Sequence, residues 1–156
     1  SILGLHFYKE FSKGVFLNYE KINSHAEKIV KEFDVKTPNI KTPIRNLSGG
    51  NQQKVVVGRE ISFSPDFLIA SQPTRGLDIG ATEFIHQLLV NLRNQGKAIL
   101  LVSADLDEIL NLSDRILVMY NGEIVGSFIE GEVDEKELGY YMTGVKRQKE
   151  LKEALT

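Results

Sequence analysis

The chain has 156 residues, enough for one ordinary domain, and 42% of them are hydrophobic and 26% charged. A formal net charge of -2 gives no reason to expect a nucleic-acid partner or a general affinity for anionic membranes. The absence of cysteine excludes disulfides and thiolate metal sites. No apolar run approaches the roughly 20 residues that a membrane-spanning helix needs. The opening "SILGLHF", without an initiator Met or a basic leader, predicts a piece of a longer cytoplasmic chain.

The first part of the chain predicts helices joined by loops. Residues 5–20 are rich in aromatic side chains and irregular. Pro38 and Pro43 disfavour helix and place a loop between two helical segments. The expected helices run from about Tyr19 to Phe33, capped by Asn18, and from Gly49 to about Ser62, capped by Ser48.

From Phe63 the pattern changes to strands that alternate with helices, and this alternation predicts an α/β fold. Two short, continuous apolar runs are typical of parallel strands covered on both faces. Asn121 and Gly122 give the strongest short turn signal, within a β-hairpin. The expected elements are strands at Phe67–Ala70 and Ala98–Ser103, helices at Gly80–Asn94 and Leu106–Leu112, a hairpin at Arg115–Ile129 and a last helix from Asp134 to Met142.

The segment "NLSGGNQQKVVVGRE", residues 46–60, is the strongest candidate for a binding site. A Ser-Gly-Gly turn enters a helix whose first N–H groups lack intrahelical partners and whose start carries about half a positive charge. Gly49 and Gly50 allow a ligand to approach the backbone, and the Ser48 hydroxyl adds a donor. These features favour an anion such as phosphate. A capped helix with a flexible entry explains the same residues equally well.

The string "LSGGNQQKV" resembles the signature motif of ATP-binding cassette (ABC) ATPases, in the variant of the sugar and nucleoside importers. Further along, "PTRGLDIGA" resembles the family's D-loop, and "LVSADLDEILNLSDRILVMYNGEIV" resembles the strand, switch loop and hairpin that close the cassette. The resemblance covers residues 1–142 in order and spacing. It implies an α/β fold, namely an incomplete P-loop NTPase core with an α-helical signature subdomain. The expected divisions are the helical subdomain at 1–62, the C-terminal part of the core at 63–145 and a charged tail at 146–156.

The resemblance also implies roles for individual residues. Cassettes of this family pair head to tail, and the signature of one closes on the ATP that the other holds. Asp78 would lie in the D-loop, but it is also the ordinary N-cap of the following helix, and both interpretations stay open. The residues implied to face a partner's nucleotide are Ser48, Gly49, Gly50, Asn51 and Gln52, with Gly76, Leu77 and Asp78 in the D-loop.

At three positions where the resemblance implies residues for ATP hydrolysis, the side chains cannot bind magnesium or activate water. Ser71 stands where the family usually has a magnesium-binding Asp, Gln72 where it has the catalytic Glu, and Ala104 where it has the switch His. The P-loop motif G-x-x-x-x-G-K-[ST] is absent, and the resemblance places it upstream of this segment. We therefore expect no intact catalytic residue and no metal ligand. ATP and Mg²⁺ are expected only in an assembled cassette pair. We expect no ATP hydrolysis by this segment alone.

The implied function is energy coupling in an importer of nucleosides or simple sugars, at the cytoplasmic face of the membrane. The implied partners are a second cassette in the same parent chain, transmembrane permease subunits and, indirectly, a solute-binding protein. Two alternatives stay open: a non-catalytic interaction module of the same fold, and an ABC protein outside transport. His6, His25 and His86 show neither metal-ligand spacing nor a paired acid, and we expect His86 at a surface.

The resemblance finally predicts a gap in the sheet. In the family the P-loop strand lies between the strand expected at residues 98–103 and the one expected at residues 115–120. Without that strand, both neighbours present unpaired edges. We therefore expect the isolated chain to be marginally stable, rearranged or oligomeric.

Overall fold

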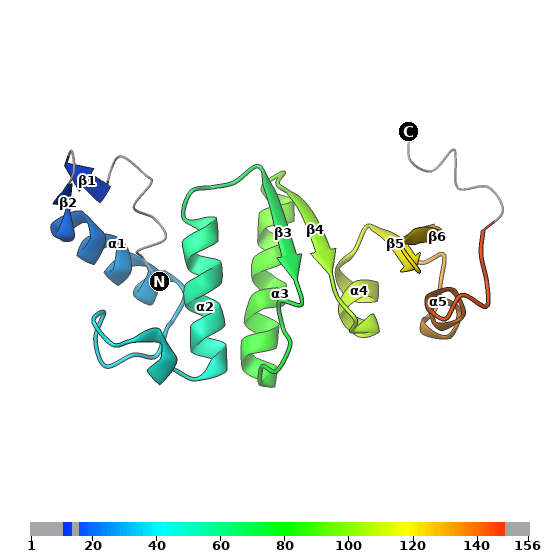
Figure 1. The fold of residues 1–156 in the computed structure, drawn as a ribbon, viewed down its shortest axis with the longest axis horizontal. Helices are drawn as coiled ribbons and strands as arrows, with labels where there is room; N and C mark the ends of the chain where they lie inside the picture. Colours follow the sequence, from blue (N-terminus) through cyan, green and yellow to red (C-terminus); the bar gives the residue numbers. More distant parts are fainter. Residues whose placement is uncertain (1–10, 14–15, 149–156) are drawn as a thin grey trace.

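The structure is a computed structural model that describes residues 11–13 and 16–148. The predictions for the first ten residues, including His6, and for the tail beyond residue 148 lie outside the described residues. From α1 (Tyr19–Glu32) onwards the elements follow one another along the long axis of the molecule roughly in chain order (Figure 1).

The N-terminal part is built from two helices and a small hairpin. The Asn18 side chain caps the first helix by accepting a hydrogen bond from the Lys21 N–H at 3.3 Å, as predicted. Gly58 brings the two helices together, because a Cβ there would lie 2.9 Å from both Ile29 and Phe33. The elements are β1 (Ser12–Lys13), β2 (Phe16–Leu17), α1 (Tyr19–Glu32), the 3-10 helix η3 (Ile44–Asn46) and α2 (Gly49–Ile61).

A strand–helix–strand unit follows and confirms the predicted α/β character. Strands β3 (Phe67–Ser71) and β4 (Ala98–Val102) pair in parallel, with Ser71 opposite Val102. Helix α3 (Ile79–Asn94) connects them and covers one face of the pair with Ile85 and Leu89, which are buried against Ala70. The other face is uncovered (Figure 1).

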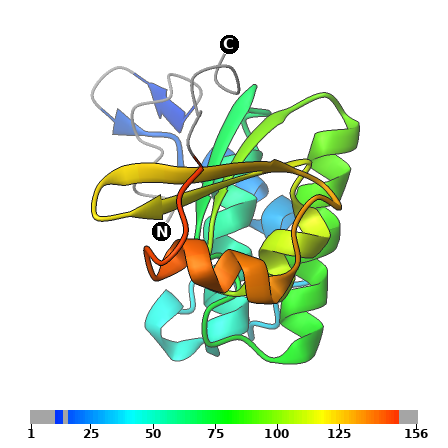
Figure 2. The same ribbon diagram turned by 90° about the vertical axis from the view of Figure 1, so that its right-hand side faces the viewer.

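The C-terminal part is an antiparallel hairpin packed on a helix. Its two strands are joined by a turn at Asn121 and Gly122, both with positive φ, as the turn signal predicted. Leu138 and Val125 lie at the centre of the core between the hairpin and the last helix, which Figure 2 shows beneath the strands. The elements are α4 (Leu106–Leu112), β5 (Arg115–Tyr120), β6 (Glu123–Ile129) and α5 (Glu135–Met142).

The predicted gap in the sheet is present among the described residues. Their strands form three separate two-stranded sheets, β1–β2, β3–β4 and β5–β6, and no ladder joins β4 to β5. Large apolar side chains are exposed on the uncovered sheet surfaces, including Ile69 at 60% and Met119 at 65%. Within the described residues, no helix has the length and hydropathy needed to cross a membrane.

Candidate functional site

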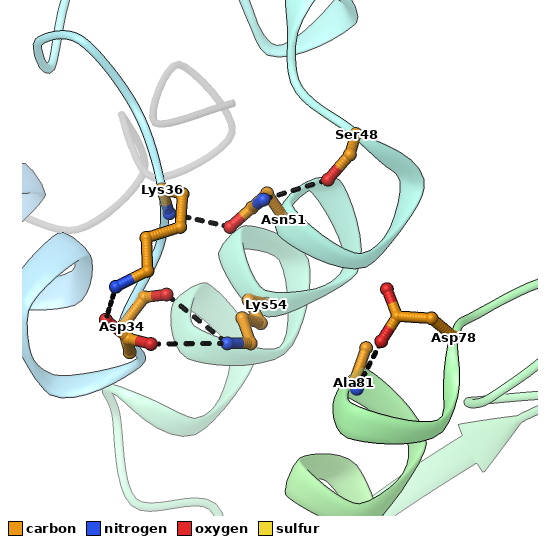
Figure 3. Close-up of polar contacts among 7 residues, drawn as sticks. All are labelled: Asp34, Lys36, Ser48, Asn51, Lys54, Asp78 and Ala81. Carbon is orange, nitrogen blue, oxygen red and sulfur yellow. Dashed lines mark hydrogen bonds and ion pairs between the residues drawn. The ribbon is translucent and has the colours of Figure 1, made fainter.

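The start of α2 carries the candidate anion site. Ser48 occupies the N-cap position and is exposed, but its side chain does not cap the helix, contrary to the prediction. Its hydroxyl oxygen instead accepts a hydrogen bond from the Asn51 side-chain amide at 2.8 Å (Figure 3). Because that bond uses an oxygen lone pair, the hydroxyl hydrogen remains able to donate to a ligand.

The two amide side chains that follow are bound within the protein. The Asn51 side-chain oxygen accepts a hydrogen bond from the Lys36 backbone N–H at 2.6 Å, which fixes α2 to the preceding loop. The Gln52 amide nitrogen donates to the Leu47 carbonyl at 2.8 Å. Each amide thus orients the turn, and the donors left at the helix start are the first backbone N–H groups, the Ser48 hydroxyl and the second hydrogen of each side-chain amide.

The two glycines of the turn lie in different surroundings. A Cβ on Gly49 would meet nothing within 4 Å, so its backbone is open to a ligand. A Cβ on Gly50 would lie 3.1 Å from the Ala81 Cβ and 3.8 Å from an Asp78 carboxylate oxygen. Gly50 therefore allows the starts of α2 and α3 to lie side by side (Figure 3).

The predicted D-loop residues precede α3. Gly76 has φ of 75°, a left-handed conformation that favours glycine, and the Leu77 N–H donates to the Thr74 carbonyl at 3.1 Å. The Asp78 carboxylate caps α3 by accepting a hydrogen bond from the Ala81 N–H at 2.9 Å. The N-cap interpretation of Asp78 is thus confirmed, and its second carboxylate oxygen faces Gly50.

The three unsuitable positions lie at one edge of the β3–β4 pair. Parallel strands end at the same edge, and the Gln72 N–H donates to the Val102 carbonyl at 2.7 Å, just before Ala104. Gln72 has φ of 49°, unusual for a residue with a side chain. Ser71 and Gln72 offer only neutral oxygens where Mg²⁺ prefers carboxylates, so these residues do not fit a resident magnesium ion. Among the described residues, no group of three or more His, Cys, Asp or Glu could hold a metal.

Basic side chains beside α2 are paired with one acid. The Lys36 ammonium donates to the Asp34 carboxylate at 2.6 Å, and Lys54 lies 3.9 Å from the other carboxylate oxygen (Figure 3). The hydrogen bond from Lys36, followed by the charge of the same residue, lowers the pKa of Asp34. Asp34 pairs with both Lys36 and Lys54, so one positive charge of this group stays uncompensated and adds to the positive end of the helix.

The structure corrects the prediction for His86. Its Nε2 lies 3.0 Å from the carboxylate of Glu108, so the histidine does have a paired acid. Glu108 is buried, and its carboxylate also accepts a hydrogen bond from the Thr74 hydroxyl at 2.8 Å. Nothing in the sequence around Glu108 indicates its burial, because it looks like an ordinary polar residue of a short helix.

Gln53 is a second residue that sequence reasoning did not place. Its amide nitrogen donates to the Pro73 carbonyl at 2.8 Å and so joins α2 to the loop after β3. The paired glutamines of the signature string therefore differ in their contacts, since Gln52 stays within its own turn and Gln53 reaches across.

Comparisons with solved structures define the class of protein. The chain matches a nucleotide-free ATP-binding cassette of an ABC transporter with a TM-score of 0.66 and 26% identity, over 90% of this chain and 56% of that one. A dimeric bacterial ABC transporter cassette matches with a TM-score of 0.63 and 25% identity, over 76% of this chain and 51% of that one. The chain is part of an ABC-type ATP-binding cassette.

Within that class, the chain belongs to the sugar and nucleoside import group. It is 52% identical to the nucleoside import ATP-binding protein NupA of Lactococcus lactis subsp. cremoris, over 85% of this chain and 26% of NupA. It is 48% identical to the guanosine import ATP-binding protein NupO of Bacillus subtilis, over 92% of this chain and 28% of NupO. The chain thus spans about a quarter of the length of these relatives. No protein-family model matches it.

Proposed function

We propose that this segment works in an ABC importer of nucleosides or simple sugars, where it supplies the signature motif and D-loop to a composite ATP site. The P-loop of that site comes from a second cassette in the same parent chain. The names of the relatives, which are import ATP-binding proteins for nucleosides, guanosine and ribose, support this class of solute. The observation that carries the proposal is the open backbone at Gly49, at the start of α2.

The contact with nucleotide follows from the donors at that turn. The backbone N–H groups at Gly49 and Gly50, together with the Ser48 hydroxyl, bind the terminal phosphate of an ATP held by the partner cassette. Asn51 and Gln52 hold the turn in shape through their bonds to Lys36 and Leu47, and the second hydrogen of each side-chain amide adds a donor toward the phosphate. Asp78 lies beside this turn, because its carboxylate faces Gly50, and Gly76 and Leu77 precede it directly in the chain.

The segment's own side of the cassette contributes no hydrolysis. Ser71, Gln72 and Ala104 offer neither a carboxylate for a metal nor a base for water. ATP and Mg²⁺ therefore belong to the assembled pair, and this segment alone is inactive.

The assembly places the segment at the cytoplasmic face of the membrane, bound to transmembrane permease subunits and, through them, to a solute-binding protein. We propose that the helical subdomain extends to residue 62 and that the core portion runs from 63 to 145. The strand-helix-strand pattern that begins at β3 supports this division.

The test is Gly49→Val in the full-length protein within its transporter. A Cβ at this position meets none of the described residues within 4 Å, so we expect the variant to fold while its side chain occupies the proposed place of the phosphate. We expect ATP turnover to fall on the order of 10²-fold, the effect of losing donors aimed at a reacting phosphate.

Gly139→Val in α5 is the matched control. Gly139 is also a helical glycine with nothing within 4 Å of a Cβ, and it lies in the C-terminal part, remote from α2 along the molecule. We expect wild-type turnover from this variant. Undiminished turnover in Gly49→Val would remove the proposed role of the signature turn.

A further inference from the structure

Glu108 is a buried carboxylate that the proposed function leaves unused. Its side chain is 1% exposed, and one of its carboxylate oxygens forms hydrogen bonds with both Thr74 and His86. The other oxygen is buried and has no hydrogen-bond partner among the described residues. Such an arrangement is costly, and an apolar side chain of similar size is often as stable or more so. The carboxylate therefore calls for a role other than stability.

The contacts of Glu108 join segments that are distant in the sequence. Thr74 belongs to the loop between β3 and α3, 34 residues before Glu108, and His86 belongs to α3. The Glu108 N–H donates to the Asp105 carboxylate at 3.2 Å, so Glu108 is part of the first turn after Ala104. One side chain thus ties the loop after β3 to the loop after β4.

The loop after β3 transmits this contact to the D-loop. The Thr74 carbonyl accepts from the Leu77 N–H, and the Gln72 carbonyl accepts from the Arg75 N–H at 3.3 Å. These two turns connect Thr74 to the D-loop residues through backbone hydrogen bonds. Gln53 of α2 donates a hydrogen bond to the carbonyl of Pro73, the residue before Thr74.

We propose that Glu108 is a positioning residue, which fixes the D-loop through Thr74 and sets its distance from the loop that contains Ala104. This inference rests on the proposed function, because ATP turnover depends on the D-loop only if the segment completes a composite site. Glu108 itself touches no nucleotide in this account. His86 holds the carboxylate from the α3 side, so that Glu108 keeps one orientation toward Thr74.

The experiment compares Thr74→Val, which keeps the shape but removes the hydroxyl, with Thr74→Ser, which keeps the hydroxyl. Hydrogen exchange at residues 75–78 is followed by mass spectrometry in the full-length protein within its transporter. In Thr74→Val and in Glu108→Leu we expect exchange to rise about tenfold, the factor that loss of one hydrogen bond to a charged group brings. Thr74→Ser is expected to retain the protection.

The kinetic readout separates positioning from binding. We expect kcat for ATP to fall in Thr74→Val and in Glu108→Leu while KM stays unchanged, and the double variant to be no worse than either single one. Unchanged exchange in Thr74→Val, or additive losses in the double variant, would overturn the inference. If Glu108→Leu fails to fold, the comparison of Thr74→Val with Thr74→Ser tests the inference by itself. Gly49→Val leaves the Thr74–Glu108 contact unchanged, so full ATP turnover in that variant would contradict the proposed function and not this inference.

Discussion

Individual glycines in this chain serve opposite purposes, which their surroundings reveal. Gly58 lies where α1 and α2 meet, and a Cβ would come within 2.9 Å of Ile29 and Phe33. Gly139 lies within α5, where a Cβ would meet nothing. The same residue type therefore permits close helix packing at one position and only weakens a helix at the other.

At Gly58 we predict that Gly58→Ala destabilises the protein by about 1–3 kcal/mol, because the added methyl group overpacks the interface between α1 and α2. Gly139→Ala is expected to stabilise it by about 0.5–1 kcal/mol through helix propensity. Urea unfolding of both variants of the full-length protein measures the two effects. A loss of stability at both positions would contradict the contrast in their environments.

At the scale of an element, the residue that precedes α3 is its N-cap, Asp78, which also faces the start of α2. Asp78 caps the helix through the Ala81 N–H, and its other oxygen faces the start of α2 near Gly50. Capping requires only an acceptor, whereas a role toward nucleotide or attacking water would require the carboxylate. A substitution that keeps the cap but removes the charge can separate the two roles.

We predict that Asp78→Ala costs about 1 kcal/mol of stability, while Asp78→Ser costs only a few tenths of a kcal/mol because serine also caps helices well. If Asp78 serves the composite site, ATP turnover falls in both variants. Thermal unfolding and ATP turnover of the full-length protein provide the measurements. Full turnover in Asp78→Ser would reduce Asp78 to a helix cap.

For the whole molecule, the uncovered faces of the small sheets are the dominant feature. Phe67 and Ile69 of β3 are exposed, as are Leu100 and Val102 of β4. Apolar side chains gathered on a sheet face with unpaired edges favour association with another chain.

We predict that the 156-residue polypeptide alone self-associates through this face. The double substitution Ile69→Lys and Leu100→Lys is expected to reduce association, because association would bury two ammonium groups at a high cost in free energy. Lysine at Val145, an exposed apolar residue outside the β3–β4 face, is the control. Sedimentation velocity over a range of concentrations measures the effect. A monomer at every concentration would contradict the prediction.

The sequence by itself determined the order and kind of the helices and strands from α1 onwards, but not the small β1–β2 hairpin or the 3-10 helix η3. The period of apolar residues in α1 and α3, the turn at Asn121 and Gly122 and the caps at Asn18 and Asp134 are local signals, and they set helices and strands over short distances. The prediction of an anion site at the start of α2 likewise rests on one continuous string, residues 47–55. The resemblance of the motifs to ABC cassettes also predicted that no strand would pair with β4 on the side toward β5, as the sheet order of the described residues shows.

Tertiary structure decided which side chains meet. The Ser48 hydroxyl was expected to cap α2, but the Asn51 amide takes its oxygen instead. Nothing local in "DLDEIL" showed that Glu108 would be buried against His86 and Thr74, because those residues lie 22 and 34 positions away in the sequence. Packing of α3 against α4 brings them together. Contacts of this kind depend on how whole elements pack together. Sequence periodicity indicates which face of each element is buried, but not which other element covers that face.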